Sequence, residues 1–132
     1  MNIEQLDHLV LTVSDIDKTT DFYAHVMGME VIIFGDNRKA LRFGQQKINL
    51  HLAGHEIEPK ADNPTPGSAD LCFITSMPMD EILKHLEACK VEPLMSPDYR
   101  TGATHRLMSV YFRDPDNNLI EVSNRLLDDI AL

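Results

Sequence analysis

The chain has 132 residues, of which 43% are hydrophobic, and it carries a formal net charge of -9 at pH 7. This length suits one compact domain of about 100 to 150 residues, and the acidic charge opposes a nucleic-acid partner, because neutralising phosphates requires clustered Lys and Arg. No apolar run approaches the about 20 residues of a membrane span, no secretory signal opens the chain, and two cysteines are too few for a disulfide framework, so we expect a cytoplasmic protein with no membrane partner.

The first elements expected are a strand and a helix. Residues 6–13 alternate in polarity, which is typical of a half-buried strand and puts His8 on the more polar face. Ser14 and Asp17 have the spacing of a capping box, which predicts that a helix begins there. Apolar residues then follow at helical spacing until Gly28, which we expect to end the helix.

Further strands complete the first half of the chain, and the last of them carries a second histidine. We expect these strands at 29–34, 39–43 and 47–52. The alternation in the last strand places His51 with polar residues, opposite an apolar face. Residues 54–68 are rich in proline and polar side chains, which predicts a surface linker.

The second half repeats this order. The pattern predicts a strand at 69–75, a helix at 79–89, a loop at 97–108 and strands at 107–113 and 118–123. Between the last two strands, residues 114–118 read DPDNN, which is typical of a tight turn because proline fixes φ and Asn tolerates the left-handed conformation. The strand after this turn delivers Glu121.

The repeated order indicates an internal duplication. DHLVLTV matches ADLCFIT, which pairs His8 with Asp70, and INLHLAG matches NLIEVSN, which pairs His51 with Glu121. The second copy is longer, and its extra residues fall within 97–108. Four side chains able to bind a metal therefore occupy corresponding places in two copies of one unit.

These segments resemble a known superfamily. DHLVLTV with the helix after it, RKALRFGQQKINLH, PGSADLCFIT and YFRDPDNNLIEV are similar to hallmark segments of the vicinal oxygen chelate superfamily, most of all to glyoxalase domain-containing proteins and lactoylglutathione-lyase-like virulence proteins. The resemblance implies an α+β fold in which two paired βαβββ modules with curved mixed sheets enclose a metal cavity. Within a single domain at 1–132, it implies module one at about 4–53, a linker at 54–68, module two at 69–124 and a tail at 125–132.

The resemblance also implies a metal site. His8 matches the family's first-strand ligand, Glu121 its last-strand carboxylate and His51 the last-strand ligand of module one, while Asp70 stands where several relatives have histidine. Imidazoles with carboxylates suit one divalent ion per site, Zn, Ni, Mn or Fe(II), rather than the all-oxygen shell of Ca or Mg. The alternative for each histidine is a hydrogen-bonded structural role.

Other residues are candidates for contact with a substrate. Ser109, Tyr111 and Arg113 share one face of their strand, and Tyr111 resembles a strand tyrosine that contacts substrate in fosfomycin enzymes. Arg100 suits bidentate binding of a carboxylate or phosphonate. The alternatives are a core aromatic and a solvated arginine. Cys72 is expected to be a buried, inert thiol. The remaining histidines are expected at the surface or in loops: His25, His55, His85 and His105.

The function expected is that of a metal-dependent, glyoxalase-like enzyme of the lyase or isomerase type, acting on a small substrate that chelates the metal through adjacent oxygens. Glu121 would also carry a proton beside a carbonyl. The alternatives are a thiol transferase of the fosfomycin-resistance kind, with glutathione as co-substrate, an extradiol-type dioxygenase, or a binding module without chemistry. The resemblance implies a homodimer in which residues of both chains share each site.

Overall fold

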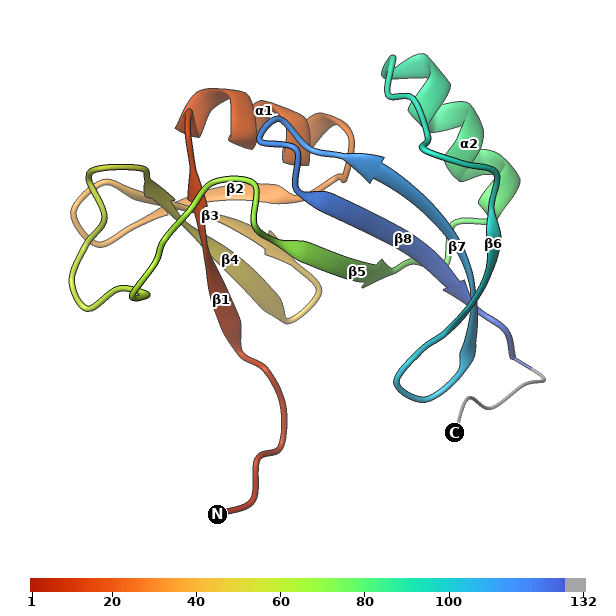
Figure 1. Cartoon of the computed structure of the whole chain (residues 1–132), viewed down its shortest axis with the longest axis horizontal. Coiled ribbons are helices and arrows are strands. Elements are labelled where there is room, and N and C mark those ends of the chain that lie inside the picture. The colour runs from red at the N-terminus through yellow and green to blue at the C-terminus, as the bar shows by residue number, and fades with distance from the viewer. Residues whose placement is uncertain (128–132) are drawn as a thin grey trace. The chain divides into compact units, whose positions relative to one another are not determined.

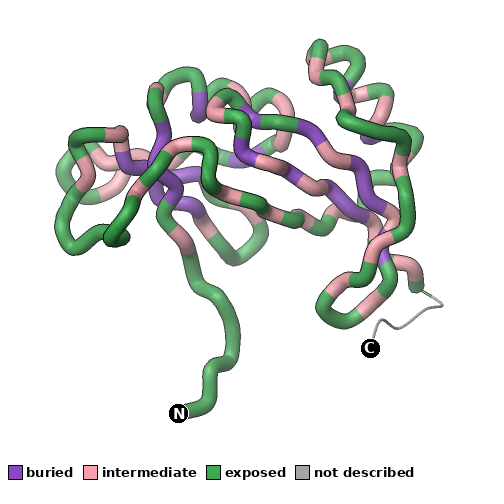
Figure 2. The backbone as a smooth tube through the Cα atoms, viewed as in Figure 1, coloured by how far each residue is buried: buried purple, intermediate pink, exposed green. Residues whose placement is uncertain are grey.

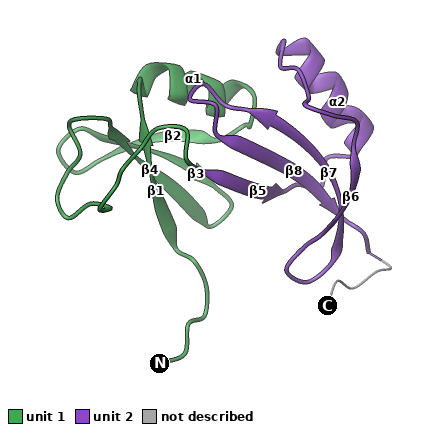
Figure 3. Cartoon of the chain, in the orientation of Figure 1, with its two compact units in different colours: residues 1–68 green, residues 69–132 purple. Residues whose placement is uncertain are grey.

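The structure is a computed structural model that describes residues 1–127. The chain divides into two compact units, unit 1 at Met1–Ser68 and unit 2 at Ala69–Leu132 (Figure 3). Within residues 1–127, each unit contains one strand, one helix and three further strands in that order (Figure 1). The fold is therefore α+β with two βαβββ modules, as the sequence predicts. The predicted tail at 125–132 lies partly outside the described residues.

Unit 1 is a four-stranded sheet with one helix. Its elements are β1 (His8–Val13), α1 (Ile16–His25), β2 (Glu30–Phe34), β3 (Arg38–Phe43) and β4 (Gln46–Leu52). The strand order is β1-β4-β3-β2, with β1 parallel to β4 and the other pairs antiparallel. Leu11, Leu41 and Ile48 are buried on one face of this sheet, and Tyr23 of α1 is buried as well. These apolar side chains form the core between helix and sheet.

Helix α1 begins differently from the prediction. Asp15, not Ser14, is the N-cap residue, because its Oδ1 accepts a hydrogen bond of 2.9 Å from the Lys18 amide. The predicted capping box of Ser14 and Asp17 is therefore wrong, and an aspartate one residue later satisfies the first turn. The helix ends at His25, before Gly28, whose φ of +68° turns the chain into β2.

Unit 2 repeats the topology of unit 1. Its elements are β5 (Asp70–Ile74), α2 (Met79–Ala88), β6 (Asp98–Thr101), β7 (Arg106–Arg113) and β8 (Leu119–Arg125). The order β5-β8-β7-β6 again has a parallel first pair and antiparallel neighbours. Buried residues are frequent along β7 and β8 (Figure 2), and Val110, Phe112 and Ile120 form the apolar face. No helix within residues 1–127 has the length and apolar character to cross a membrane.

The segment predicted as a loop at 97–108 contains a strand. β6 pairs antiparallel with β7, with Asp98 opposite Ser109 and Thr101 opposite Arg106. A tight connection follows, in which the Gly102 amide donates to the His105 carbonyl at 2.9 Å. A Cβ at Gly102 would lie 2.7 Å from that oxygen, so only glycine fits. β6 was missed because its four residues, DYRT, have no apolar alternation.

The tight turn before β8 confirms the prediction from DPDNN. Asp114 Oδ1 accepts from the amides of Asp116 at 2.9 Å and Asn118 at 3.0 Å. Asn117 has φ +65°, the left-handed conformation that asparagine tolerates. The Asn118 side chain is fully buried, donates to Asp114 Oδ2 and accepts from the Ala69 amide, both at 2.8 Å. The turn therefore ties the start of β5 to the start of β8.

Candidate functional site

Each sheet has a second face, opposite the apolar one, which we call the site face. In unit 2 the strand registers align three residues on it, because Cys72 lies opposite Glu121 on β5 and β8, and Glu121 lies opposite Tyr111 on β7. Asp70 lies on the same face, two residues before Cys72. The predicted face shared by Ser109, Tyr111 and Arg113 is also this one.

The carboxylate of Glu121 is held by two serines. Ser109 Oγ donates to Glu121 Oε2 at 2.6 Å, and Ser123 Oγ lies 3.3 Å from the same oxygen. The two hydroxyl oxygens are 2.6 Å apart, and both serines are buried. A hydroxyl has only one proton, so when Ser109 donates to Glu121, the Ser123 proton goes to one of three acceptors: Ser109 Oγ, Glu121 Oε2 or Cys72 Sγ, which is 3.5 Å away. Buried donors of this kind fix the orientation of a carboxylate.

Cys72 and Tyr111 flank this carboxylate. Loss of solvation raises the pKa of Cys72, the Ser123 hydrogen bond opposes this, and the negative charge of Glu121 raises the pKa further. Loss of solvation likewise raises the pKa of Tyr111, against the hydrogen bond from Arg100. Both groups therefore keep their protons at neutral pH. Cys72 is exposed rather than buried as expected, yet its raised pKa opposes a role as a nucleophile.

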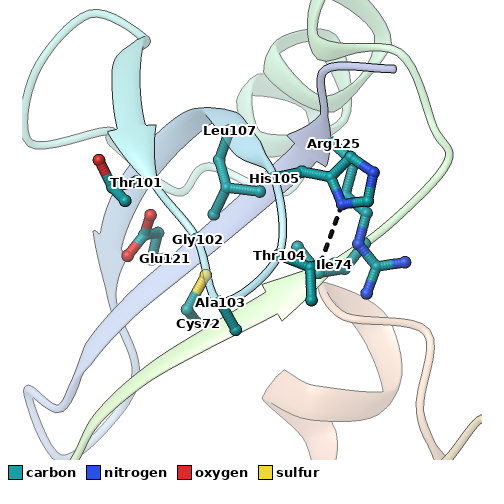
Figure 4. Close-up of a pocket in the computed structure, with 10 residues that line it drawn as sticks. All are labelled: Cys72, Ile74, Thr101, Gly102, Ala103, Thr104, His105, Leu107, Glu121 and Arg125. Atoms are coloured by element: carbon teal, nitrogen blue, oxygen red, sulfur yellow. Dashed lines mark hydrogen bonds between the residues drawn. The ribbon is translucent and has the colours of Figure 1, made fainter. Parts of the chain in front are cut away.

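A pocket of about 300 Å³ lies over this part of the site face. Figure 4 shows the ten residues that line it. Glu121 and Cys72 come from the sheet, and the connection between β6 and β7 contributes Thr104 and His105, which are joined by a hydrogen bond of 2.9 Å. Arg125 adds a cationic side chain. The pocket thus combines one carboxylate, hydroxyls and basic groups, a set suited to a small oxygenated ligand.

Sequence reasoning missed some of these groups and placed others differently. His105 was expected at the surface or in a loop, and the hairpin of β6 and β7 puts it in the pocket lining. The extra residues at 97–108 were the signal that could have found it. No sequence pattern singled out Arg125, because it only continues the alternation of the strand that carries Glu121.

The predicted substrate-binding residues have structural partners. Arg100 donates from Nε to the Tyr111 hydroxyl at 3.0 Å, and its guanidinium lies 5.3 Å from the ring centroid. It also pairs with Asp98 at 3.2 Å. Arg113 is exposed and lies 3.4 Å from the Asn117 carbonyl oxygen. The residues that line the pocket do not include Arg100, Tyr111, Arg113 or Ser109. Ser109 instead orients Glu121, and Arg100 orients Tyr111.

The two predicted histidine ligands lie on the site face of unit 1. His8 Nδ1 is 2.8 Å from Asp7 Oδ2, which orients the ring, so Nε2 is the nitrogen that would be available to a metal. His51 is only 5% exposed. Burial and the nearby charge of Arg38 lower the pKa of His51, while Glu56 opposes the shift. Its imidazole is therefore neutral at pH 7, the form that binds metals.

The strand registers show that the two copies are not equivalent at every predicted ligand. His8 lies opposite Lys47, so His51 is four residues beyond its partner, whereas Asp70 lies opposite Leu119, so Glu121 is two residues beyond. At about 3.3 Å per residue, these offsets are about 13 and 7 Å along the strand. When the strand starts are aligned, Asn49 rather than His51 corresponds to Glu121.

The structure therefore places the predicted ligands two in each unit, without bringing the members of a pair into contact. His8 and His51 belong to one unit, and Asp70 and Glu121 belong to the other. Within residues 1–127, no group of three His, Cys, Asp or Glu side chains is arranged to hold a metal. The donor chemistry still fits a divalent ion, because imidazole nitrogens and carboxylate oxygens are ligands that Zn, Ni, Mn and Fe(II) accept.

The chain is similar to several proteins of known sequence or structure. Virulence protein STM3117 of Salmonella typhimurium is 55% identical over 93% of this chain and 85% of that protein. Its crystal structure superposes with a TM-score of 0.94, at 54% identity over 96% of this chain and all of that chain, 100%. Glyoxalase domain-containing protein RDO1 of Mycosarcoma maydis is 52% identical over 94% of this chain and 70% of that protein.

A more distant solved structure carries a metal. A mutant of the fosfomycin resistance protein FosX of Listeria monocytogenes, complexed with Mn(II) and (1S,2S)-dihydroxypropylphosphonic acid, has a TM-score of 0.65 at 26% identity. The match covers 96% of this chain and 94% of that chain. Residues 5–122 match the family described as the glyoxalase/bleomycin resistance protein/dioxygenase superfamily. On this match and on the topology of its two modules, the chain belongs to that superfamily.

Proposed function

We propose that this chain is a metal-dependent enzyme of the glyoxalase kind, a lyase or isomerase acting on a small substrate with adjacent oxygen atoms. The observation that carries the proposal is the Glu121 carboxylate, which borders the pocket and is fixed by the Ser109 and Ser123 hydroxyls. Fixed carboxylates beside a cavity suit both metal binding and proton transfer.

The candidate metal ligands are His8, His51 and Glu121, with Asp70 as a further candidate. Because His8 and His51 are offset by about 13 Å along their strands, one ion would take only one of these two histidines from a given chain. Zn, Ni, Mn and Fe(II) all accept such a set. When bound, the ion would act as a Lewis acid on the substrate oxygens. The candidates lie two in each unit. We propose a homodimer in which the histidines of one chain meet the carboxylates of the other, which predicts elution at twice the monomer mass of 15.0 kDa.

The other residues have supporting roles in this proposal. Glu121 accepts and returns a proton beside a substrate carbonyl, and the protonated phenol of Tyr111 donates a hydrogen bond to a substrate oxygen. Arg100 is a positioning residue, because it holds the Tyr111 hydroxyl at 3.0 Å. The pocket beneath the connection of β6 and β7 takes the rest of the substrate.

A second candidate is a transferase that adds a thiol, with glutathione as the co-substrate, to a phosphonate. FosX, which is similar in fold, is a fosfomycin resistance protein whose complex contains a phosphonic acid with two hydroxyls. Arg125 and His105, in the pocket of this chain, are basic groups of the kind that bind such an anion.

The experiment begins with metal analysis of the purified protein. Activity is then measured on methylglyoxal hemithioacetal, and on fosfomycin with glutathione, under Ni, Mn and Zn. His8→Ala and Glu121→Gln should lose metal and activity together, while the control His55→Ala, in a loop of unit 1, should keep both. A protein that binds no divalent ion and is unaffected by His8→Ala would rule out the enzyme proposal. Turnover of only the hemithioacetal indicates a lyase, and turnover of only fosfomycin with glutathione indicates a transferase.

A further inference from the structure

The site face of unit 1 contains two polar atoms that are buried without a partner. Within residues 1–127, the buried side-chain nitrogen and oxygen atoms that lack a hydrogen bond are Arg38 Nε and Asn49 Oδ1. Asn49 is only 6% exposed. Unpaired buried polar atoms reduce stability, so proteins retain them mainly where they serve another purpose. One is a donor and the other an acceptor.

These two residues are neighbours on the sheet. Ala40 of β3 lies opposite Asn49 of β4, and Arg38 precedes Ala40 by two residues, so Arg38 is the diagonal neighbour of Asn49 on the same face. Lys47 is two residues from Asn49 on β4 and shares that face as well. One donor, one acceptor and an additional cation thus occupy one small area.

The cations of this area are held by an aromatic ring and not by carboxylates. The Arg38 guanidinium lies 4.8 Å from the Phe34 ring centroid, and Lys47 Nζ lies 4.0 Å from it. Neither forms an ion pair with a carboxylate in the described part of the chain. By contrast, Arg42, on the same strand and face, is bound to Glu30 with a hydrogen bond of 3.0 Å from its Nε. Despite a net charge of -9, this area is locally positive.

We propose that Arg38, Asn49 and Lys47 form a subsite for a small hydroxy acid. Arg38 Nε donates to an anionic oxygen, a hydroxyl next to that anion donates to Asn49 Oδ1, and Lys47 adds positive charge. Such a ligand satisfies the unpaired donor and the unpaired acceptor at once. The proposal deepens the proposed function, on which it rests for the role of the site face, by assigning an acidic group to the substrate.

The test uses the full chain, stripped of metal, and glycolate as the probe. Titration followed by nuclear magnetic resonance should shift the Arg38 Nε–H signal. Acetate, which lacks the hydroxyl, should bind about tenfold more weakly than glycolate, and ethylene glycol, which lacks the anion, should bind more weakly still. Arg38→Gln and Asn49→Leu should each weaken glycolate binding by about ten- to a hundredfold.

The matched control is Arg42→Gln, which removes an arginine from the same strand and face but one already paired with Glu30. It should leave glycolate binding unchanged. Arg38→Lys, which keeps the charge but lacks Nε, should recover only part of the affinity, and circular dichroism confirms that each variant is folded. The proposal fails if glycolate leaves the Arg38 signal in place, or if Arg42→Gln weakens binding as much as Arg38→Gln.

The same measurements separate this proposal from the proposed function. His8→Ala should abolish metal binding but leave glycolate binding to the metal-free protein intact. A protein that binds glycolate but no metal keeps the subsite and refutes the enzyme. A protein that binds metal but not glycolate keeps the enzyme and refutes the subsite.

Discussion

Two buried asparagines in this chain should respond in opposite ways to the same substitution. Asn49 has an unpaired Oδ1, whereas Asn118 is bonded to Asp114 and to the Ala69 amide, both at 2.8 Å. Leucine has a side chain with the same number of heavy atoms and no polar group. Asn49→Leu therefore removes an unpaired buried oxygen, and burying such an atom without a partner costs about 1 to 3 kcal/mol of stability. Asn118→Leu instead removes both hydrogen bonds, so the Ala69 amide loses its acceptor and Asp114 Oδ2 loses this donor.

After allowing for tighter packing of the larger methyl groups, we expect Asn49→Leu to raise the free energy of unfolding by about 1 kcal/mol. For a chain of 132 residues, this raises Tm by about 3 to 5 °C. Asn118→Leu should lower the free energy of unfolding by about 2 to 4 kcal/mol. Urea unfolding followed by circular dichroism, with metal-free protein, measures both changes.

The sign of the change in the free energy of unfolding for Asn49→Leu tests whether Asn49 lacks a structural partner. If this substitution destabilises the protein about as much as Asn118→Leu, the Asn49 amide has a structural partner, and the subsite loses its main support. If it stabilises the protein while glycolate binding is lost, Asn49 is retained for ligand binding at the expense of stability.

Three further predictions concern the site faces. Ser109→Ala, which removes a donor to Glu121, should lower metal affinity about ten- to a hundredfold. The control Ser76→Ala, at an exposed serine, should leave metal affinity unchanged. Equal effects of the two substitutions would contradict the role of Ser109. Since the folded pKa of His51 lies below the unfolded value of about 6.5, the unfolded state binds more protons, and metal-free protein should lose stability as pH falls from about 7 through 6.5. His51→Gln should flatten this dependence, and an unchanged slope would refute it. Iodoacetamide at pH 7 should alkylate Cys72 more slowly than a free thiol, and Glu121→Gln should speed the reaction; an unchanged rate would show that the carboxylate does not raise the pKa.

Much of the fold is decided locally and was therefore predictable. Period-two alternation placed His8 and His51 with polar residues and put Ser109 and Tyr111 on one face, because successive side chains of a strand point to opposite sides. The DPDNN turn was predictable because its conformation depends on the residues within it. The start and end positions of helices and strands are less predictable and vary by a residue or two, as the shift of the α1 N-cap to Asp15 shows.

The pairing of strands was decided only by the tertiary structure. The face of a residue follows from its own strand, but its opposite neighbour depends on the register with another strand, which sequence alternation leaves open by multiples of two. For this reason the sequence alignment of the two copies matched His51 with Glu121. In the strand registers, the residue of unit 1 that corresponds to Glu121 is Asn49. β6 became a strand because β7 supplied its hydrogen bonds, not because of its own residues. The pocket around His105 and Arg125 follows from that pairing, since contacts between distant segments, unlike alternation within one, are fixed only when the sheets assemble.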